Sequence, residues 1–167
     1  MSNEKKLKKL FKRLEEIEAY GRSIGKLSFD MECCAPEEGI GPAGEDMAVL
    51  GKQIHKMTHD KRYEKLICEL HEDSEGLTPV QKKTVEHLYD HYAKSKNISA
   101  KLSYEMDLAG NKAYGAWLSA KKSNDFSQFR DALADLIKYT RIGIDLRDEK
   151  KGSYYDTCLD DIEKGGS

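Results

Sequence analysis

Apolar residues recur every three or four positions along most of this 167-residue chain, and that spacing predicts helices. The longest such stripe begins near Glu4 and is predicted to reach Asp30, with Gly21 and Gly25 as points where the helix is disturbed. Only 3 prolines are present, and no stretch alternates apolar and polar residues as a strand does. We therefore expect an all-α fold.

The rest of the chain divides into a loop and further helical stripes. The segment CAPEEGIGPAGE, residues 34–45, holds two prolines and three glycines and is predicted to be a loop. Apolar stripes then occupy residues 47–57, 63–70, 85–92, 102–120 and 126–144. Short connections separate them, so we expect about five to six helices in an antiparallel bundle or stack, forming a single domain over residues 1–167.

Three sequence signals predict where helices begin. Thr78 is followed by Pro79 and Gln81, which together suit an N-cap, the first helical position and the reciprocal partner of a capping box. Ser99 is expected to cap the next helix. Asp125 with Gln128 forms another capping pair, and we expect it to start the last long helix.

Composition excludes several functional classes. The chain carries 28 basic and 30 acidic residues, a net charge of -2, which gives no basis for binding nucleic acid. No apolar run is long enough to span a membrane. The four cysteines form no CxxC pair, so we expect reduced thiols in a cytoplasmic protein. The acidic residues near the C-terminus are interpreted as a solvated tail.

Two histidine pairs raise the question of a zinc site. HKMTH places His55 and His59 four residues apart, and HLYDH does the same for His87 and His91. Residues at this spacing share one helix face, as in the HExxH motif of zinc peptidases. That motif also needs a glutamate directly after the first histidine, and Lys56 and Leu88 hold those positions. We therefore expect ordinary surface or boundary histidines, with a small complete metalloprotein using either pair as an alternative.

Other catalytic motifs are missing from the sequence. There is no GxSxG nucleophile elbow and no phosphate-binding glycine loop. From the residues alone we assign no catalytic, cofactor-binding or metal-binding residue in this chain.

Three stretches of the sequence carry a resemblance to a known family. They are SFDMECCAPEEGI at 28–40, WLSAKKSNDFSQFRDALADLI at 117–137 and YYDTCLDDIEKGGS at 154–167. In order and spacing they resemble the N-terminal region of the carboxypeptidase Taq family of zinc metallocarboxypeptidases. The matching residues are Phe29, Asp30, Pro36, Trp117, Ala120, Lys121, Asp125, Phe126, Phe129, Tyr155, Asp156, Leu159, Asp160, Glu163 and Gly165.

The chain departs from the family pattern at a few positions. Phe29 stands where tryptophan is usual, Arg130 and Asp131 fall where a proline is frequent, and Lys164 falls where proline is usual. Of the matched residues, we expect Trp117 to pack in a helix interface and Asp125 to cap a helix.

The resemblance implies a fold and an activity for a complete family member. The fold is an elongated helical architecture whose helices wall a deep groove, and the activity is removal of C-terminal residues from peptides by a zinc-bound water. None of the family's zinc ligands or its catalytic glutamate corresponds to a residue of this chain, so zinc is implied for the full-length enzyme and no cofactor for this chain.

We therefore interpret the chain as the N-terminal helical part of a zinc metallocarboxypeptidase. It would form a wall or lid of the substrate groove, be inactive alone, and have the C-terminal catalytic part and peptide substrates as partners. An uncovered apolar face predicts self-association of the isolated chain. The alternative is a stand-alone helical interaction module that docks a partner through its charged amphipathic first helix.

Overall fold

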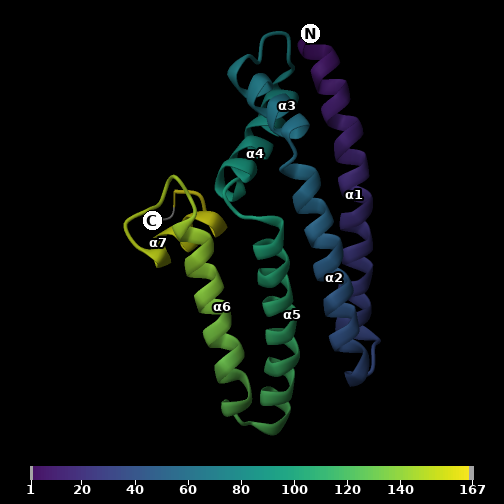
Figure 1. The fold of residues 1–167 in the computed structure, drawn as a ribbon, viewed down its shortest axis with the longest axis vertical. Coiled ribbons are helices and arrows are strands. Elements are labelled where there is room, and N and C mark those ends of the chain that lie inside the picture. The colour runs from purple at the N-terminus through teal and green to yellow at the C-terminus, as the bar shows by residue number, and fades with distance from the viewer. Residues whose placement is uncertain (1, 166–167) are drawn as a thin grey trace.

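A computed structural model describes residues 2–165, and within them the chain forms seven α-helices and no strand (Figure 1). The prediction of an all-α fold is confirmed. The helices are α1 (Asn3–Cys33), α2 (Glu37–Thr58), α3 (Lys61–Glu72), α4 (Pro79–Ser95), α5 (Ala100–Ser123), α6 (Ser127–Asp145) and α7 (Tyr154–Ile162).

Four of the helices lie side by side in one layer rather than in a closed bundle. In Figure 1 the order across the layer is α1, α2, α5 and α6, and successive helices run in opposite directions. Each packs on its neighbour in that order, α1 on α2, α2 on α5 and α5 on α6. The short helices α3 and α4 pack on each other, and α3 also packs on α1 at one end of the layer. Of the two expected arrangements, the structure is therefore the stack.

Two of the three predicted helix starts have the expected geometry. At α4, the Thr78 hydroxyl accepts a hydrogen bond from the Gln81 amide at 3.3 Å, and the Gln81 side chain accepts one from the Thr78 amide at 2.9 Å. At α5, the Ser99 hydroxyl accepts from the Leu102 amide at 3.1 Å. These bonds satisfy amides that a helix N-terminus otherwise leaves without partners.

The third predicted start differs in detail. The Asp125 carboxylate accepts a hydrogen bond from the Ser127 amide at 3.0 Å, and it also accepts one from the Gln128 side chain at 3.3 Å. Phe126 stands between Asp125 and the first residue of α6 in helical conformation. Asp125 thus braces the turn before α6, but the Gln128 side chain does not return to the backbone as a capping box requires.

The predicted loop at residues 34–45 is wrong, because α2 already begins at Glu37. Glycine and proline argue against a helix locally, but a contact between helices decides here. Gly44 is buried where α2 meets α5, and a Cβ atom there would lie 2.8 Å from Cβ of Asn111. The Asn111 side chain donates to the Gly44 carbonyl at 2.8 Å. Gly44 therefore serves the close approach of two helices, not a turn.

The acidic C-terminal stretch is a helix rather than a solvated tail. The Ser153 hydroxyl caps α7 by accepting from the Asp156 amide at 3.1 Å. Arg147 donates two hydrogen bonds to the Asp161 carboxylate, at 3.0 and 2.7 Å, and Lys94 on α4 approaches the same carboxylate at 2.7 Å. Ion pairs and a cap anchor this short helix, so apolar periodicity did not predict it.

The main hydrophobic core lies at the end of the layer where α1, α3 and α4 meet. We call it the closed end, and its buried members are Leu7, Leu10, Tyr63, Ile67, Leu70, Leu77 and Val85. The other buried apolar side chains are spread along α1, α2, α5 and α6 and are mostly methionine and alanine: Met31, Met47, Ala48, Met57, Ala113, Ala120 and Ile144. The accessible surface is 11048 Å², about a third more than the roughly 8,400 Å² typical of a folded monomer of 19.0 kDa. The excess fits an elongated layer that leaves apolar surface uncovered.

Candidate functional site

The first histidine pair lies on the last turns of α2 and is part of the scaffold. The rings of His55 and His59 stack with centroids 3.8 Å apart. Nε2 of His55 is 2.7 Å from the Ile98 carbonyl oxygen, and Nε2 of His59 is 3.0 Å from the Ser95 hydroxyl. Nδ1 of His59 is 2.8 Å from the His55 carbonyl oxygen. The pair therefore ties the end of α2 to the connection between α4 and α5.

The environment of this pair favours neutral imidazoles. Burial lowers the pKa of His55, and the proximity of His59 lowers it further, while the bond to the Ile98 carbonyl opposes both. Burial likewise lowers the pKa of His59. Nε2 of His55 and both ring nitrogens of His59 lie within hydrogen-bonding distance of protein groups, as expected for boundary histidines with a structural role.

The second pair is more open. His87 and His91 lie on the exposed side of α4, with ring centroids 6.2 Å apart and the rings edge-on. Across residues 2–165, no group of three or more His, Cys, Asp or Glu side chains is placed to hold a metal ion. The arrangement gives neither pair the third protein ligand that a zinc site needs.

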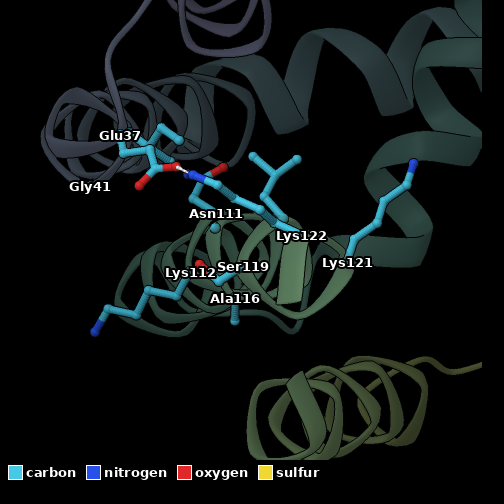
Figure 2. Close-up of a pocket in the computed structure, with 11 residues that line it drawn as sticks. Glu37, Gly41, Asn111, Lys112, Ala116, Ser119, Lys121 and Lys122 are labelled. Atoms are coloured by element: carbon cyan, nitrogen blue, oxygen red, sulfur yellow. Dashed lines mark hydrogen bonds and ion pairs between the residues drawn. The ribbon is translucent and has the colours of Figure 1, made fainter. Parts of the chain in front are cut away.

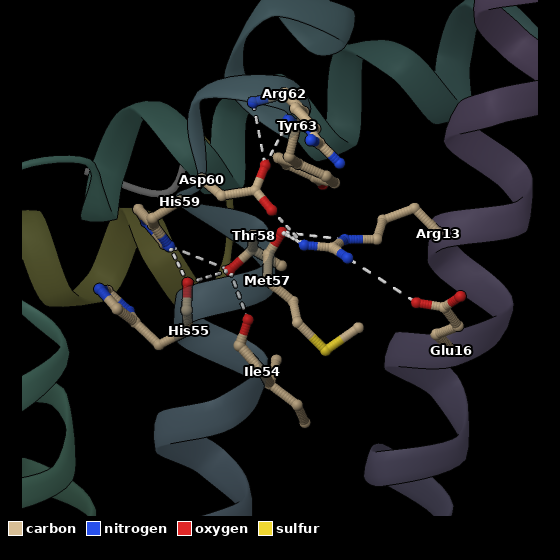
Figure 3. A network of polar contacts seen from close by, with 10 residues as sticks. All are labelled: Arg13, Glu16, Ile54, His55, Met57, Thr58, His59, Asp60, Arg62 and Tyr63. Carbon is tan, nitrogen blue, oxygen red and sulfur yellow. Dashed lines mark hydrogen bonds and ion pairs between the residues drawn. The ribbon is translucent and has the colours of Figure 1, made fainter.

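A polar network next to the first pair fixes the junction of α1, α2 and α3 (Figure 3). The Arg13 guanidinium of α1 donates to the Met57 carbonyl at the end of α2 and forms an ion pair with Asp60. The Asp60 carboxylate also caps α3 by accepting from the amides of Arg62 and Tyr63, at 3.0 and 2.8 Å. A cation at a helix C-terminus and a carboxylate at a helix N-terminus each interact favourably with the helix dipole and so stabilise the helix. The network is structural, and sequence analysis did not predict it.

One pocket, of about 730 Å³, lies between the start of α2 and the second half of α5 (Figure 2). Lys122 bridges it by an ion pair with Glu37 at 2.6 Å, and hydrogen bonding to Lys122 lowers the pKa of the Glu37 carboxyl. The floor is formed by small and apolar residues such as Ile40, Gly115 and Ala116. A single carboxylate already held by a lysine offers no acid and base pair, so the pocket has no evident catalytic chemistry.

A second pocket, of about 520 Å³, lies between α1, α2 and α5. Its α5 residues Gly110 and Tyr114 lie nearly opposite Lys112, Ala116 and Ser119 of the first pocket, because a helix turns by about 100° per residue. The two pockets share Asn111 but use different parts of α2, residues 37–41 in the first and Met47 and Gly51 in the second. The second is lined by Ile24, Ser28, Met31, Glu32, Met47, Gly51, Met106, Asp107, Gly110, Asn111 and Tyr114.

The aromatic residues that carry the family resemblance lie largely at the surface. Phe29, Phe126 and Tyr155 are 65%, 61% and 74% exposed. Trp117 is 41% exposed, with its ring centroid 6.0 Å from that of Tyr114 and the Lys121 ammonium 4.9 Å from the ring centre. Trp117, which was expected to pack in a helix interface, is thus partly exposed, and the contacts described for its ring are with Tyr114 and Lys121 of its own helix. These exposed aromatic side chains contribute little to the hydrophobic core of this chain. Exposed apolar side chains of this kind are typical of surfaces that contact another protein segment.

The chain belongs to the carboxypeptidase Taq (M32) metallopeptidase family, which it matches over residues 6–167. The resemblance inferred from the three stretches is thereby confirmed. Gly166 and Ser167, at the end of the third stretch, lie outside the described residues.

Particular relatives show how much of the family fold is present. The chain is 29% identical over 158 residues to Carboxypeptidase 1 of Bacillus subtilis (strain 168), covering 95% of this chain and 31% of that protein. It superposes with a TM-score of 0.90 on a structure described as "BsuCP Crystal Structure", at 28% identity over 98% of this chain and 33% of that one. A structure described as "The Structure of CHT" gives a TM-score of 0.72 at 28% identity with the same coverage.

The chain thus spans about a third of the length of the relatives it matches. Among its described residues, no helix is both long and apolar enough to cross a membrane.

Proposed function

We propose that residues 1–167 act as one helical unit of a zinc metallocarboxypeptidase and form a wall or lid of its substrate groove. The observation that carries the proposal is a helical layer, in a chain of the carboxypeptidase Taq family, that matches a third of the structure described as "BsuCP Crystal Structure" with a TM-score of 0.90. A single layer of packed helices can line one side of a groove when the rest of a protein packs on it.

In this proposal the chain's residues contribute shape rather than chemistry. When bound in the catalytic part, zinc supplies a metal-activated water for peptide hydrolysis. The network of Arg13, Met57 and Asp60 and the stacked pair of His55 and His59 keep α2 in place between α1 and α5. A rigid wall holds a bound peptide in position and keeps water out of the groove. Because this chain would supply only the wall, we expect the isolated chain to have no peptidase activity.

A chimera tests the proposal directly. The matched third of the Bacillus subtilis relative is replaced by this chain, and release of C-terminal residues from peptides is measured with and without a zinc chelator. We expect zinc-dependent release by the chimera and none by this chain alone. A chimera that folds by circular dichroism but does not cleave peptides would contradict the proposal, as would zinc-dependent turnover by the isolated chain.

The alternative, a stand-alone module that docks through its first helix, gains no support from the contacts of α1. Leu7 and Leu10, on the apolar face of that helix, are buried against α3 and α4 in the closed end. The self-association of the isolated chain stays a prediction, and light scattering at high protein concentration tests it; a strictly monomeric chain would count against it.

A further inference from the structure

The two histidine pairs have the same spacing in sequence, but their rings are oriented differently. His55 and His59 are stacked, with ring planes 14° apart and ring centroids 3.8 Å apart (Figure 3). His87 and His91 have ring planes 66° apart and ring centroids 6.2 Å apart. The lone pair of an imidazole nitrogen lies in the plane of its ring, so one ion bound by two imidazoles must lie close to both planes.

This requirement separates the two pairs. Nearly parallel planes at stacking distance meet only far from the rings, so His55 and His59 cannot direct both lone pairs at one ion in this arrangement. Planes inclined at 66° meet near the rings, so His87 and His91 can converge on one point. Metal–nitrogen bonds of about 2.0–2.1 Å place the two ring centres about 5 Å apart, about 1 Å closer than in this structure. Rotation of two exposed side chains supplies that movement.

The ring nitrogens of His87 and His91 are also available to a ligand. Both side chains are exposed, and within residues 2–165 neither ring forms a hydrogen bond or an ion pair. The Ser95 hydroxyl donates to His91 at 2.8 Å, but the acceptor is the main-chain carbonyl. In the first pair, by contrast, three of the four ring nitrogens lie within hydrogen-bonding distance of protein groups, and a metal ion would have to displace those groups.

The charges beside the second pair offer little opposition to a cation. Lys83 lies about one turn before the pair and Lys94 about one turn after it, so both share this side of α4. Lys83 is paired with Glu86 at 3.0 Å, and Lys94 is paired with Asp161 at 2.7 Å. A carboxylate therefore offsets each lysine charge, which weakens the repulsion of a divalent ion.

We propose that His87 and His91 chelate a divalent transition-metal ion on the exposed side of α4, with water in the remaining coordination positions. Imidazole suits Cu²⁺, Ni²⁺ and Zn²⁺, and the general order of affinities places Cu²⁺ first. Two protein ligands are fewer than a structural or catalytic zinc centre has, so the ion exchanges with solution. The inference concerns α4 alone and does not depend on the proposed function.

Isothermal titration of Cu²⁺ into the untagged 167-residue chain tests the site. The background variant Cys33→Ser/Cys34→Ser removes the exposed thiols, which also bind such ions. In this background we expect one ion bound per chain, with Ni²⁺ and Zn²⁺ bound more weakly than Cu²⁺, and His87→Gln should weaken binding roughly tenfold or more. His55→Gln/His59→Gln, the matched control with the same spacing, should retain the affinity.

Two further measurements report on the ligands themselves. The electron paramagnetic resonance spectrum of bound Cu²⁺ should show coupling to two imidazole nitrogens in the background variant and to one after His91→Gln. Cu²⁺ should also raise the melting temperature, because an ion that binds only the folded chain stabilises it by mass action. His91→Gln should abolish that rise and leave the melting temperature without metal nearly unchanged, since the side chain is exposed.

Three results would overturn the inference. One is an affinity that His87→Gln leaves unchanged, because the ion would then be bound adventitiously by other surface groups. Another is an equal loss of affinity in His55→Gln/His59→Gln when circular dichroism shows that variant to be folded, because the stacked pair would then supply ligands. The third is coupling to a single imidazole nitrogen before any histidine is replaced.

Discussion

The two ends of α1 present the same pattern of apolar residues to different surroundings. At the closed end, Leu7 and Leu10 are buried in one cluster with side chains of α3 and α4. Along the second half, Ile24 is half-buried beside a pocket of about 520 Å³, and Met31 is buried at its edge. The difference shows that periodicity predicts which face of a helix is apolar, but not whether this chain supplies the cover for it.

The largest effect should come from weakening the closed end. Leu10 has no exposed surface, so Leu10→Ala should lower the free energy of unfolding by about 2–5 kcal/mol through lost apolar contact and a cavity. Ile137, which is 46% exposed on α6, provides the control, and Ile137→Ala should cost less than about 1 kcal/mol. Urea unfolding of both variants measures the difference, and equal losses would contradict the contrast between a closed and an open region.

A smaller effect is expected where the layer is closely packed. A Cβ at Gly44 would crowd Asn111, so Gly44→Ala should destabilise the chain by about 1–3 kcal/mol. Gly21 has no atom near an added Cβ, so Gly21→Ala should stabilise α1 by about 0.5–1 kcal/mol. Thermal unfolding should therefore show shifts of opposite sign; a stabilising Gly44→Ala would mean that α2 and α5 are less tightly packed than the structure shows.

The histidine pair at the boundary of the two regions should make stability depend on pH. The pKa values of His55 and His59 are lowered from the usual 6.5, so the unfolded chain binds protons more readily than the folded one. Their contribution is present above about pH 6.5 and is lost as the pH falls below it, so stability should decrease on acidification through that range. Unfolding curves from pH 7.5 to 5 measure the slope.

The double substitution His55→Gln/His59→Gln should flatten that slope. His87→Gln, at an exposed residue of α4, should leave it unchanged. An unaltered slope in the double variant would show that other groups cause the pH dependence.

The smallest effect is expected at α7, which ion pairs hold in place. Asp161→Asn removes the partner of both Arg147 and Lys94 and should cost about 0.2–1 kcal/mol, since these groups remain partly exposed. Hydrogen exchange of the α7 amides should accelerate, and high salt should produce the same change in the unsubstituted chain. Glu86→Gln, in a surface pair with Lys83, should leave α7 unaffected. Unchanged exchange in Asp161→Asn would show that α7 is held by its apolar contacts.

The sequence predicted the long helices and much of the family relationship because both depend on patterns within short stretches. The apolar spacing of α1 and the Thr78 capping box are local signals, and both are present in the structure. The start of α2 was missed because Gly44 is required for a helix contact with Asn111, which lies 67 residues away in the sequence. Helix α7 was missed because its anchors are charges contributed by α4 and by the segment before it.

The candidate site was harder to predict for the same reason. The histidine spacing was visible in sequence, but the stacking of the rings on the connection between α4 and α5 was not.

The one-layer order of α1, α2, α5 and α6 also bears on how the chain comes apart. Because each helix packs mainly on its immediate neighbours, stability should be shared between adjacent pairs, as in repeat proteins. Helix α6 has a long neighbour on one side only, so loss of structure should begin at that edge and proceed inward toward α2. The closed end would be the last region to unfold, and also the template on which the layer is rebuilt.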